Sequence, residues 1–336
     1  MTSDVTRLVI RAPNWLGDAV MALPAMAAVR AAQRRAFIAV AGVPAISPLF
    51  REGTSAQADA VVTVDGRNEP DTLRAGGFDA VLLLPNSFRS AWTARRAGIP
   101  HRWGYAAGFR TPLLTRAVRR GRGRVHQSVY YNELVGGLGM PAGDWLPHVR
   151  VSGPTASRAA TLLEESGVPP GATVVGFAPG AAYGHAKRWP PSRVAEVATR
   201  LARERGATPL LVGAAADRST GLEVETALPT DVRAVNLIGR TDLRVLAGVL
   251  ARCRAFVSND SGAMHLAAAV GVPVTAIFGP TDERATAPAG GHEVLLHPVF
   301  CRPCMLRECP IDHRCMKRVS VDRVFDAVAR RLEVPA

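Results

Sequence analysis

The stretch from Arg11 to Asp18 combines a tight turn with a carboxylate, a pairing that suits acid–base chemistry. It follows the apolar run at 7–11, which is typical of a strand. Gly17 permits the turn, and Asp18 then opens a helix. Ligands of open α/β sheets bind beyond the carboxyl ends of the strands, where the Asp18 carboxylate can accept a proton from a substrate hydroxyl. The alternative is that Asp18 only caps the helix.

A glycine-rich turn with two cations occupies the corresponding place in the second half of the chain. The run Gly176–Pro190 begins within another strand-like segment, at 174–178, and continues into the turn after it. The turn contains Gly180, Lys187 and Arg188. Backbone N–H groups beside fixed cations suit a diphosphate. The run is not a Walker loop, because no G-x-x-x-x-G-K-[ST] pattern is present.

A third motif, Val257–Ala269, predicts a second contact with phosphate. A buried strand is expected to end at Ser258, and a helix begins near Ser261 and Gly262. The free N–H groups and the dipole of this helix favour an anion at its N-terminus. His265 lies on the first turns, where it is either a packed core histidine or a site residue.

Four of the five cysteines follow the pattern Cys301-x2-Cys304-x4-Cys309-x5-Cys315. In a reducing compartment, such a density of thiols resembles a thiolate metal site. The spacing is not that of a common zinc ribbon, so a loop of reduced thiols is the alternative. Whether these cysteines hold a structural metal is therefore left open.

These motifs need a scaffold of alternating strands and helices. Short apolar runs alternate with helix-like segments, which is typical of parallel sheets wrapped by helices. Helices are expected over 18–30 and 155–167, and the Pro169-Pro170-Gly171 run is the expected linker. We therefore expect an α/β protein with two doubly wound, Rossmann-like domains that face a central cleft. Strands are expected at 7–11, 37–40, 61–64, 80–84 and 103–105, and then at 174–178, 209–212, 235–238, 255–258 and 274–278.

The composition indicates a folded and strongly basic protein. Of the 336 residues, 48% are hydrophobic and 21% charged, which excludes general disorder. The formal net charge of +13 indicates an anionic partner. The stretch 80–132 contains no Asp or Glu, so it is either a solvated basic face or an anion-binding wall. Its ten arginines are Arg89, Arg95, Arg96, Arg102, Arg110, Arg116, Arg119, Arg120, Arg122 and Arg124.

Aromatic residues lie among these arginines, a mixture that is also found in nucleic-acid-binding proteins. No helix-turn-helix, zinc-finger or RNA-binding signature is recognisable, so no nucleic-acid partner is expected. The sequence also shows no transmembrane segment and no secretion signal. A cytoplasmic location is the resulting expectation.

Together these residues resemble the ADP-heptose:lipopolysaccharide heptosyltransferases, glycosyltransferase family 9, which have the GT-B fold. The resemblance covers nearly the whole chain. The runs Ala186–Pro190 and Cys301–Met316 resemble the heptosyltransferase II branch, which adds the second core heptose. The motifs that match are Asn14–Asp18, Pro179–Pro190, Ser258–His265 and Phe278–Thr281.

The resemblance implies inverting transfer of L-glycero-D-manno-heptose from ADP-heptose to the heptose of the lipopolysaccharide inner core, with no cofactor required for catalysis. On this interpretation Asp18 is the general base, and Lys187 neutralises the leaving diphosphate. The donor contacts are Gly17, Gly180, Arg188, Asp217, Asp260, Ser261, Gly262 and His265.

The implied acceptor is lipid A–Kdo–heptose, a phosphorylated glycolipid of the membrane. The basic stretch then suits peripheral docking at the anionic inner face of the inner membrane. The implied domains are an acceptor domain at 1–167, a nucleotide-sugar domain at 168–320, and a C-terminal helix at 321–336 that packs back on the first domain. The acceptor contacts are Arg119, Arg120, Arg122 and Arg124.

One position departs from the family pattern, and one functional residue of the family has no certain counterpart. Family members often carry an acidic residue where Ala182 stands, and the carboxylate that binds the nucleotide ribose has its best counterpart in Asp217. The alternatives are another family 9 transferase with a different nucleotide-sugar or acceptor, a GT-B nucleotide-sugar epimerase, and a non-catalytic nucleotide-sugar binder.

Overall fold

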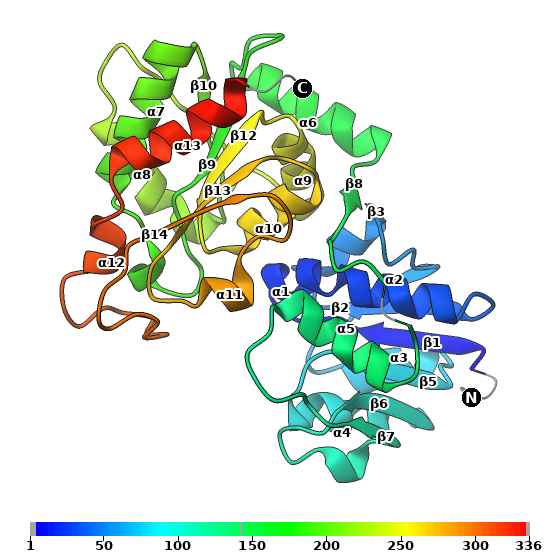
Figure 1. Ribbon diagram of the computed structural model, residues 1–336. Coiled ribbons are helices and arrows are strands. Elements are labelled where there is room, and N and C mark those ends of the chain that lie inside the picture. Colours follow the sequence, from blue (N-terminus) through cyan, green and yellow to red (C-terminus); the bar gives the residue numbers. More distant parts are fainter. Residues whose placement is uncertain (1–4, 142, 334–336) are drawn as a thin grey trace. The chain divides into compact units, whose positions relative to one another are not determined.

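Two parallel sheets of six strands form the framework, one in each of the units Met1–Arg150 and Val151–Ala336 (Figure 1). The computed structural model describes residues 5–141 and 143–333. Strands such as Val174–Ala178 are buried along their whole length, which is why nearly continuous apolar runs form them. The predicted α/β class is confirmed.

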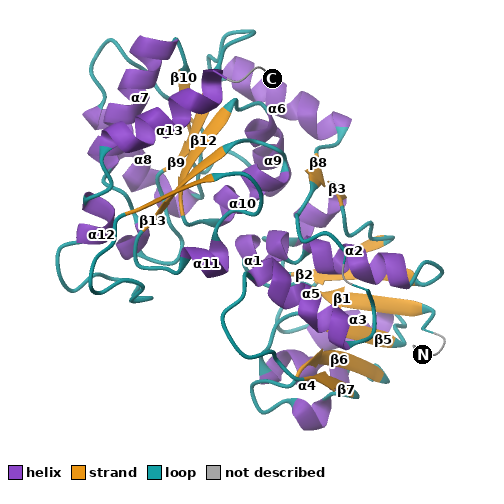
Figure 2. Cartoon of the chain, viewed as in Figure 1, coloured by secondary structure: helices purple, strands orange, loops and turns teal. Residues whose placement is uncertain are grey.

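The first unit has the strand order β4-β2-β1-β5-β6-β7. Within this sheet, the strands taken in chain order lie as 3-2-1-4-5-6, the arrangement of a Rossmann fold. Helices α1 and α2 pack against α5, while α3 packs against α4 (Figure 2). A short antiparallel ribbon, β3 with β8, ends the unit. The elements are β1 (Arg7–Arg11), α1 (Leu16–Met21), α2 (Leu23–Ala32), β2 (Phe37–Gly42), β3 (Gly53–Thr54), β4 (Ala60–Thr63), α3 (Glu69–Ala75), β5 (Ala80–Leu83), α4 (Phe88–Arg96), β6 (His101–Tyr105), β7 (Arg116–Val118), α5 (Gln127–Gly137) and β8 (Val149–Arg150).

The second unit repeats this order as β11-β10-β9-β12-β13-β14. Helices α7, α8 and α13 pack together, and α6, α9 and α10 form a second group. The elements are α6 (Gly153–Glu165), β9 (Val174–Ala178), α7 (Pro191–Arg205), β10 (Thr208–Leu211), α8 (Arg218–Ala227), β11 (Val235–Asn236), α9 (Leu243–Ala251), β12 (Ala255–Asn259), α10 (Gly262–Ala269), β13 (Val274–Phe278), α11 (Glu283–Thr286), β14 (Glu293–Leu296), α12 (Arg314–Lys317) and α13 (Val321–Glu333).

The predicted helix over 18–30 is two helices. It is divided at Ala22, and Pro24 lies in the first turn of α2. Proline has no N–H to continue the α-helical hydrogen bonds, so it is tolerated at the start of a helix but not inside one. One edge strand of each sheet, β7 in the first unit and β14 in the second, is also an addition to the predicted set.

The predicted domain boundary at residue 167 is wrong by about one helix. The units divide after Arg150, so α6 belongs to the second unit. The reason is a close contact between α6 and α9: a Cβ at Gly248 would lie 2.7 Å from the Cβ of Ala159. The Pro169-Pro170-Gly171 run is therefore the loop between α6 and β9, not the linker.

The C-terminal helix α13 also belongs to the second unit and packs in the core of that unit. Val324, Phe325 and Val328 are buried in the same core cluster as Val197 and Leu201 of α7. The Arg200 guanidinium lies 3.9 Å from the centre of the Phe325 ring. Residues 334–336 of the predicted segment lie outside the described residues.

Candidate functional site

The predicted motifs lie where the strand order of each sheet reverses. These positions are between β1 and β5 in the first unit and between β9 and β12 in the second. Doubly wound sheets bind ligands at this point, outside the carboxyl ends of the strands. The loop after β1 leads to Asp18, and the loops after β9 and β12 lead to Gly180 and Asp260.

Asp18 is the third residue of α1 and is half-buried. Trp15 occupies the N-cap position, so the alternative that Asp18 is the N-cap is wrong. Burial raises the pKa of the Tyr131 phenol on α5, and the negative charge of Asp18 raises it further. Tyr131 is therefore a neutral hydroxyl near the Asp18 carboxylate, and it lies in none of the predicted motifs.

The turn before Asp18 is held by a buried guanidinium. Arg11 is 5% exposed. Its Nε lies 2.6 Å from Glu69 Oε1, and its Nη2 donates to Asn14 Oδ1 at 3.0 Å. Because Glu69 comes from α3, this ion pair fixes the turn to a distant part of the first unit.

The N-terminus of α10 is open to a ligand on the second unit. Ser261 is its N-cap, and the Ser261 hydroxyl accepts from Met264 N at 3.3 Å. The Ser258 and Ser261 hydroxyls lie 2.9 Å apart. The first N–H groups of a helix lack intrahelical acceptors, so the turn that begins at Gly262 offers donors to an anion. His265 is 4% exposed and lies among the buried residues of this helix.

Lys187 and Asp260 form an ion pair beside this helix. Lys187 Nζ lies 2.6 Å from Asp260 Oδ2, and the side chains are 12% and 7% exposed. Thr281, just after β13, donates to the same oxygen at 2.7 Å. The structure thus brings together three segments that are far apart in the chain. The Phe278–Thr281 run was noted as a motif, but the role of Thr281 was not predicted.

The Asn259 side chain holds the glycine-rich turn in place through hydrogen bonds. Its Nδ2 donates to the carbonyls of Pro179 and Gly180, at 2.8 and 3.2 Å. Its Oδ1 accepts from Trp189 N at 3.1 Å. One buried amide at the end of β12 therefore holds both ends of the loop that carries Lys187.

Gly180 allows Asp217 to approach the same turn. A Cβ at Gly180 would lie 2.1 Å from Asp217 Cγ, so only glycine fits without a shift of Asp217. The Asp217 carboxylate accepts from Ala214 N at 3.1 Å and lies 3.9 Å from Arg188 Nη2. Arg188 Nε is buried and has no hydrogen-bond partner among the described residues. This donor and the Lys187 ammonium give the turn a basic character.

Eight of the ten arginines of the acid-free stretch fall into two groups, and the other two, Arg95 and Arg96, are exposed on α4. Arg89, Arg102, Arg110 and Arg116 donate to backbone carbonyls within the first unit. These contacts stabilise the fold, although Arg89 remains exposed at the surface. The predicted acceptor contacts Arg119, Arg120, Arg122 and Arg124 are exposed on the loop after β7.

The exposed arginine loop is not free of acids. Arg120 and Arg122 line an open pocket together with Tyr130 and Glu133. Glu133 lies one residue beyond the acid-free stretch, and α5 turns its carboxylate toward the loop. The loop is therefore a mixed site with a basic excess, which corrects the expectation of a purely basic wall.

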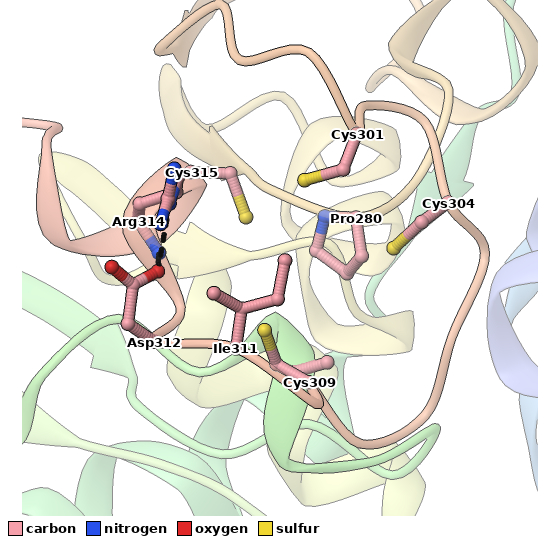
Figure 3. A pocket seen from close by; sticks show the side chains of 9 residues that line it. Pro280, Cys301, Cys304, Cys309, Ile311, Asp312, Arg314 and Cys315 are labelled. Carbon is pink, nitrogen blue, oxygen red and sulfur yellow. Dashed lines mark hydrogen bonds and ion pairs between the residues drawn. The ribbon is translucent and has the colours of Figure 1, made fainter.

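The four clustered cysteines line one small pocket, in which their sulfur atoms surround Pro280 and Ile311 (Figure 3). All four are free thiols. Burial raises the pKa of the Cys315 thiol, and the three neighbouring thiols raise it further. Among the residues that the structure describes, no three His, Cys, Asp or Glu side chains are placed to hold a metal ion.

Comparison with known proteins decides the family. The model of glycosyltransferase family 9 (heptosyltransferase) matches residues 70–314. The chain belongs to glycosyltransferase family 9. Lipopolysaccharide heptosyltransferase 2 of Escherichia coli K12 is 32% identical over 304 residues, which cover 84% of this chain and 85% of that protein.

Solved structures of family 9 share the fold. The structure of E. coli ADP-heptose lps heptosyltransferase II has a TM-score of 0.83 and 28% identity, covering 97% of this chain and 98% of that one. A family 9 protein from Veillonella parvula has a TM-score of 0.85 at 21% identity, over 99% and 98% of the two chains. The expected GT-B class and the expected enzyme class, a glycosyltransferase, are confirmed. No helix within residues 5–141 and 143–333 is both long and apolar enough to cross a membrane.

Proposed function

We propose that this family 9 protein moves L-glycero-D-manno-heptose from ADP-heptose to the heptose of the lipopolysaccharide inner core, as a heptosyltransferase II. The observation that carries the proposal is the 32% identity to lipopolysaccharide heptosyltransferase 2 across 84% of the chain. The proposal predicts two binding sites, one for each substrate, at the two switch points already described.

The second unit binds the donor in this proposal. The diphosphate lies at the N-terminus of α10, where the N–H groups that follow Ser261 and the helix dipole stabilise negative charge. Lys187 and Arg188 add fixed cations from the glycine-rich turn. When the bond from the heptose to the diphosphate breaks, ADP gains negative charge, and these groups stabilise it. Transfer needs no catalytic metal on this account.

Asp217 is proposed to bind the nucleotide ribose. Its carboxylate sits against Gly180 and is 13% exposed. Its position after β10 places it beside the turn that carries the cations. A carboxylate oxygen is a suitable acceptor for ribose hydroxyls.

The first unit supplies the base. Asp18 accepts the proton of the acceptor hydroxyl as that oxygen attacks the anomeric carbon, and the leaving ADP departs from the opposite face with inversion. A positioned carboxylate contributes about 10²–10⁴-fold to such a step.

The acceptor is proposed to be lipid A–Kdo–heptose, and Arg119, Arg120, Arg122 and Arg124 are proposed to bind its anionic groups. Guanidinium groups suit phosphate and carboxylate because they donate in pairs. The enzyme is then a peripheral protein at the cytoplasmic face of the inner membrane. No nucleic acid takes part.

The donor half of the proposal is tested by thermal unfolding. ADP and ADP-heptose should raise the melting temperature in a concentration-dependent way, since a ligand that binds only the folded state stabilises it. UDP at the same concentration should have less effect, and duplex DNA none. Stabilisation by duplex DNA alone would contradict the proposal.

A further inference from the structure

The solvent-facing side of α4 is aromatic and basic. Its exposed side chains recur at helical spacing, so they form one stripe along the helix. Phe88 is 50% and Trp92 is 46% exposed, and their rings stack with centroids 6.3 Å apart. The stripe contains Phe88, Arg89, Trp92, Arg95 and Arg96.

The buried side of α4 already supplies its packing. Ala91, Thr93 and Ala94 are the buried residues of this helix. Single exposed apolar residues are normal on protein surfaces, but a stacked aromatic pair opposite a complete packing face adds nothing to the core. The stripe is therefore not used in the packing of the core and is available for an external contact.

A third aromatic side chain lies on the next loop. Phe109 is 97% exposed, and its φ of +57° is in the left-handed region that few residues other than glycine adopt. The loop runs beside the start of α4: a Cβ at Gly108 would lie 2.8 Å from the carbonyl oxygen of Asn86 and 3.8 Å from Phe88 N.

The buried Arg110 fixes this loop to α4. Arg110 is 0% exposed. Its Nη1 donates to Ser90 Oγ at 3.1 Å and to the Pro85 carbonyl, and its Nη2 donates to Asn86 Oδ1 at 3.2 Å. The guanidinium thus holds Phe109 in a fixed exposed position.

We propose that Phe88, Arg89, Trp92, Arg95, Arg96 and Phe109 form the surface with which the first unit docks on an anionic lipid bilayer. We call it the docking surface. Aromatic rings favour the headgroup level of a bilayer, and arginines beside them are attracted to anionic lipids. No Asp or Glu occurs from residue 80 to residue 132. The nearby Asp71 of α3 is paired with Arg74, which donates to the Arg96 carbonyl. The inference rests on the proposed function in one respect, namely that the acceptor is a membrane lipid.

Vesicle sedimentation tests the docking surface without any substrate. The vesicles are phosphatidylcholine alone, or phosphatidylcholine mixed with phosphatidylglycerol. One variant carries Phe88→Ser, Trp92→Ser and Phe109→Ser, and another carries Arg95→Ser and Arg96→Ser. The matched controls carry Leu222→Ser, Phe300→Ser and Leu306→Ser, which replace exposed apolar residues of the second unit, or Arg34→Ser and Arg35→Ser, which replace an exposed arginine pair of the first unit.

The full chain should bind the anionic vesicles and bind the neutral ones much more weakly. Each docking-surface variant should bind anionic vesicles about tenfold more weakly or worse, and the controls should bind as the unchanged protein does. A thermal unfolding curve like that of the unchanged protein checks that each variant is folded. Unchanged vesicle binding in a folded docking-surface variant would overturn the inference, as would binding of the unchanged protein to duplex DNA but not to vesicles.

Two acceptors separate this inference from the proposed function. The docking-surface variants should transfer heptose more slowly to acceptor in vesicles and at the normal rate to a delipidated, water-soluble core oligosaccharide. If the unchanged protein transfers heptose to neither acceptor, the proposed function fails. If transfer to the soluble acceptor is normal and vesicle binding of the variants is unchanged, only the docking surface is wrong.

Discussion

Lys187 Nζ lies 2.6 Å from Asp260 Oδ2, although 73 positions separate the two residues. The pair sits beside the N-terminus of α10, and both side chains are close to buried. The cation expected to meet the diphosphate is therefore held in place by a carboxylate. The charge that a donor meets here depends on both residues. A substitution of either residue leaves the charge of the other one without its partner.

The Lys187→Met variant should be unstable as well as weak in donor binding. It leaves Asp260 as a buried carboxylate without its cation, and breaking a buried pair in this way costs about 3–5 kcal/mol of unfolding free energy. The double variant Lys187→Met with Asp260→Asn should recover most of that stability. Its affinity for ADP should stay about tenfold or more below normal, because a charge-assisted contact with the diphosphate is lost.

Urea unfolding and calorimetric titration with ADP measure these two effects. Lys317→Met is the control, since Lys317 is an exposed lysine of the same unit. Normal ADP affinity in the folded double variant would remove Lys187 from the donor site.

Gly180→Ala should damage the donor site through Asp217. The added methyl group would lie 2.1 Å from Asp217 Cγ, so the carboxylate must move and lose its contact with Ala214 N. We expect affinity for ADP to fall about tenfold, the loss of one good hydrogen bond to a charged group. Gly291→Ala is the control, because its methyl group would meet nothing within 4 Å. Equal ADP affinity in both variants would show that Asp217 does not bind the nucleotide.

Asp18→Asn should slow turnover by about 10²–10⁴-fold while ADP affinity stays normal. The amide has nearly the same shape but cannot take the acceptor proton. Steady-state rates and ADP titration on one preparation check both parts. Asp65→Asn, at an exposed position of the same unit, should behave as the unchanged protein does. Near-normal turnover in Asp18→Asn would reject Asp18 as the base.

The arginine loop should affect the acceptor selectively. Reversing the charge of Arg119, Arg120, Arg122 and Arg124 together should raise the acceptor KM and leave the donor KM nearly unchanged. Glu133→Gln should lower the acceptor KM, because Glu133 shares a pocket with Arg120 and Arg122. Both effects should shrink in high salt, because the screening length falls from about 8 Å at physiological ionic strength to about 3 Å at 1 M salt. Equal changes in both KM values would favour a merely solvated basic face.

Removal of metal ions should leave turnover unchanged. The proposed stabilisation of the leaving diphosphate uses Lys187, Arg188 and helix N–H groups rather than a metal. Rates are compared before and after dialysis against EDTA, with ADP-heptose and acceptor held constant. A lost rate that returns only when Mg²⁺ is added would contradict this part of the mechanism.

The central strands could be predicted because burial on both faces leaves a readable apolar run. Val174–Ala178 and Val274–Phe278 match their predicted bounds. The edge strand Arg116–Val118 could not be predicted in this way, since it is short and no residue in it is buried. The domain boundary was also out of reach, because it depends on how closely Gly248 lets α9 approach α6.

The position of the site could be predicted from the sequence, but the ion pairs between its residues could not. Motifs at strand ends placed Asp18, Lys187 and Ser261 at the switch points, because parallel strands share one carboxyl edge. The pairing of Lys187 with Asp260 joins two loops, and no local pattern encodes it. Glu133 could not be predicted as part of the arginine loop. It lies just outside the acid-free stretch in the sequence, and only the folding of α5 brings its carboxylate beside Arg120 and Arg122.

The most direct measurement of the central claim is the mass of the product. Purified protein is incubated with ADP-heptose and, separately, with inner-core acceptors that carry no heptose or one heptose. We expect the acceptor with one heptose to gain the mass of one further heptose, and the acceptor without heptose to remain unchanged. A gain on the heptose-free acceptor alone, or on neither acceptor, would contradict the account.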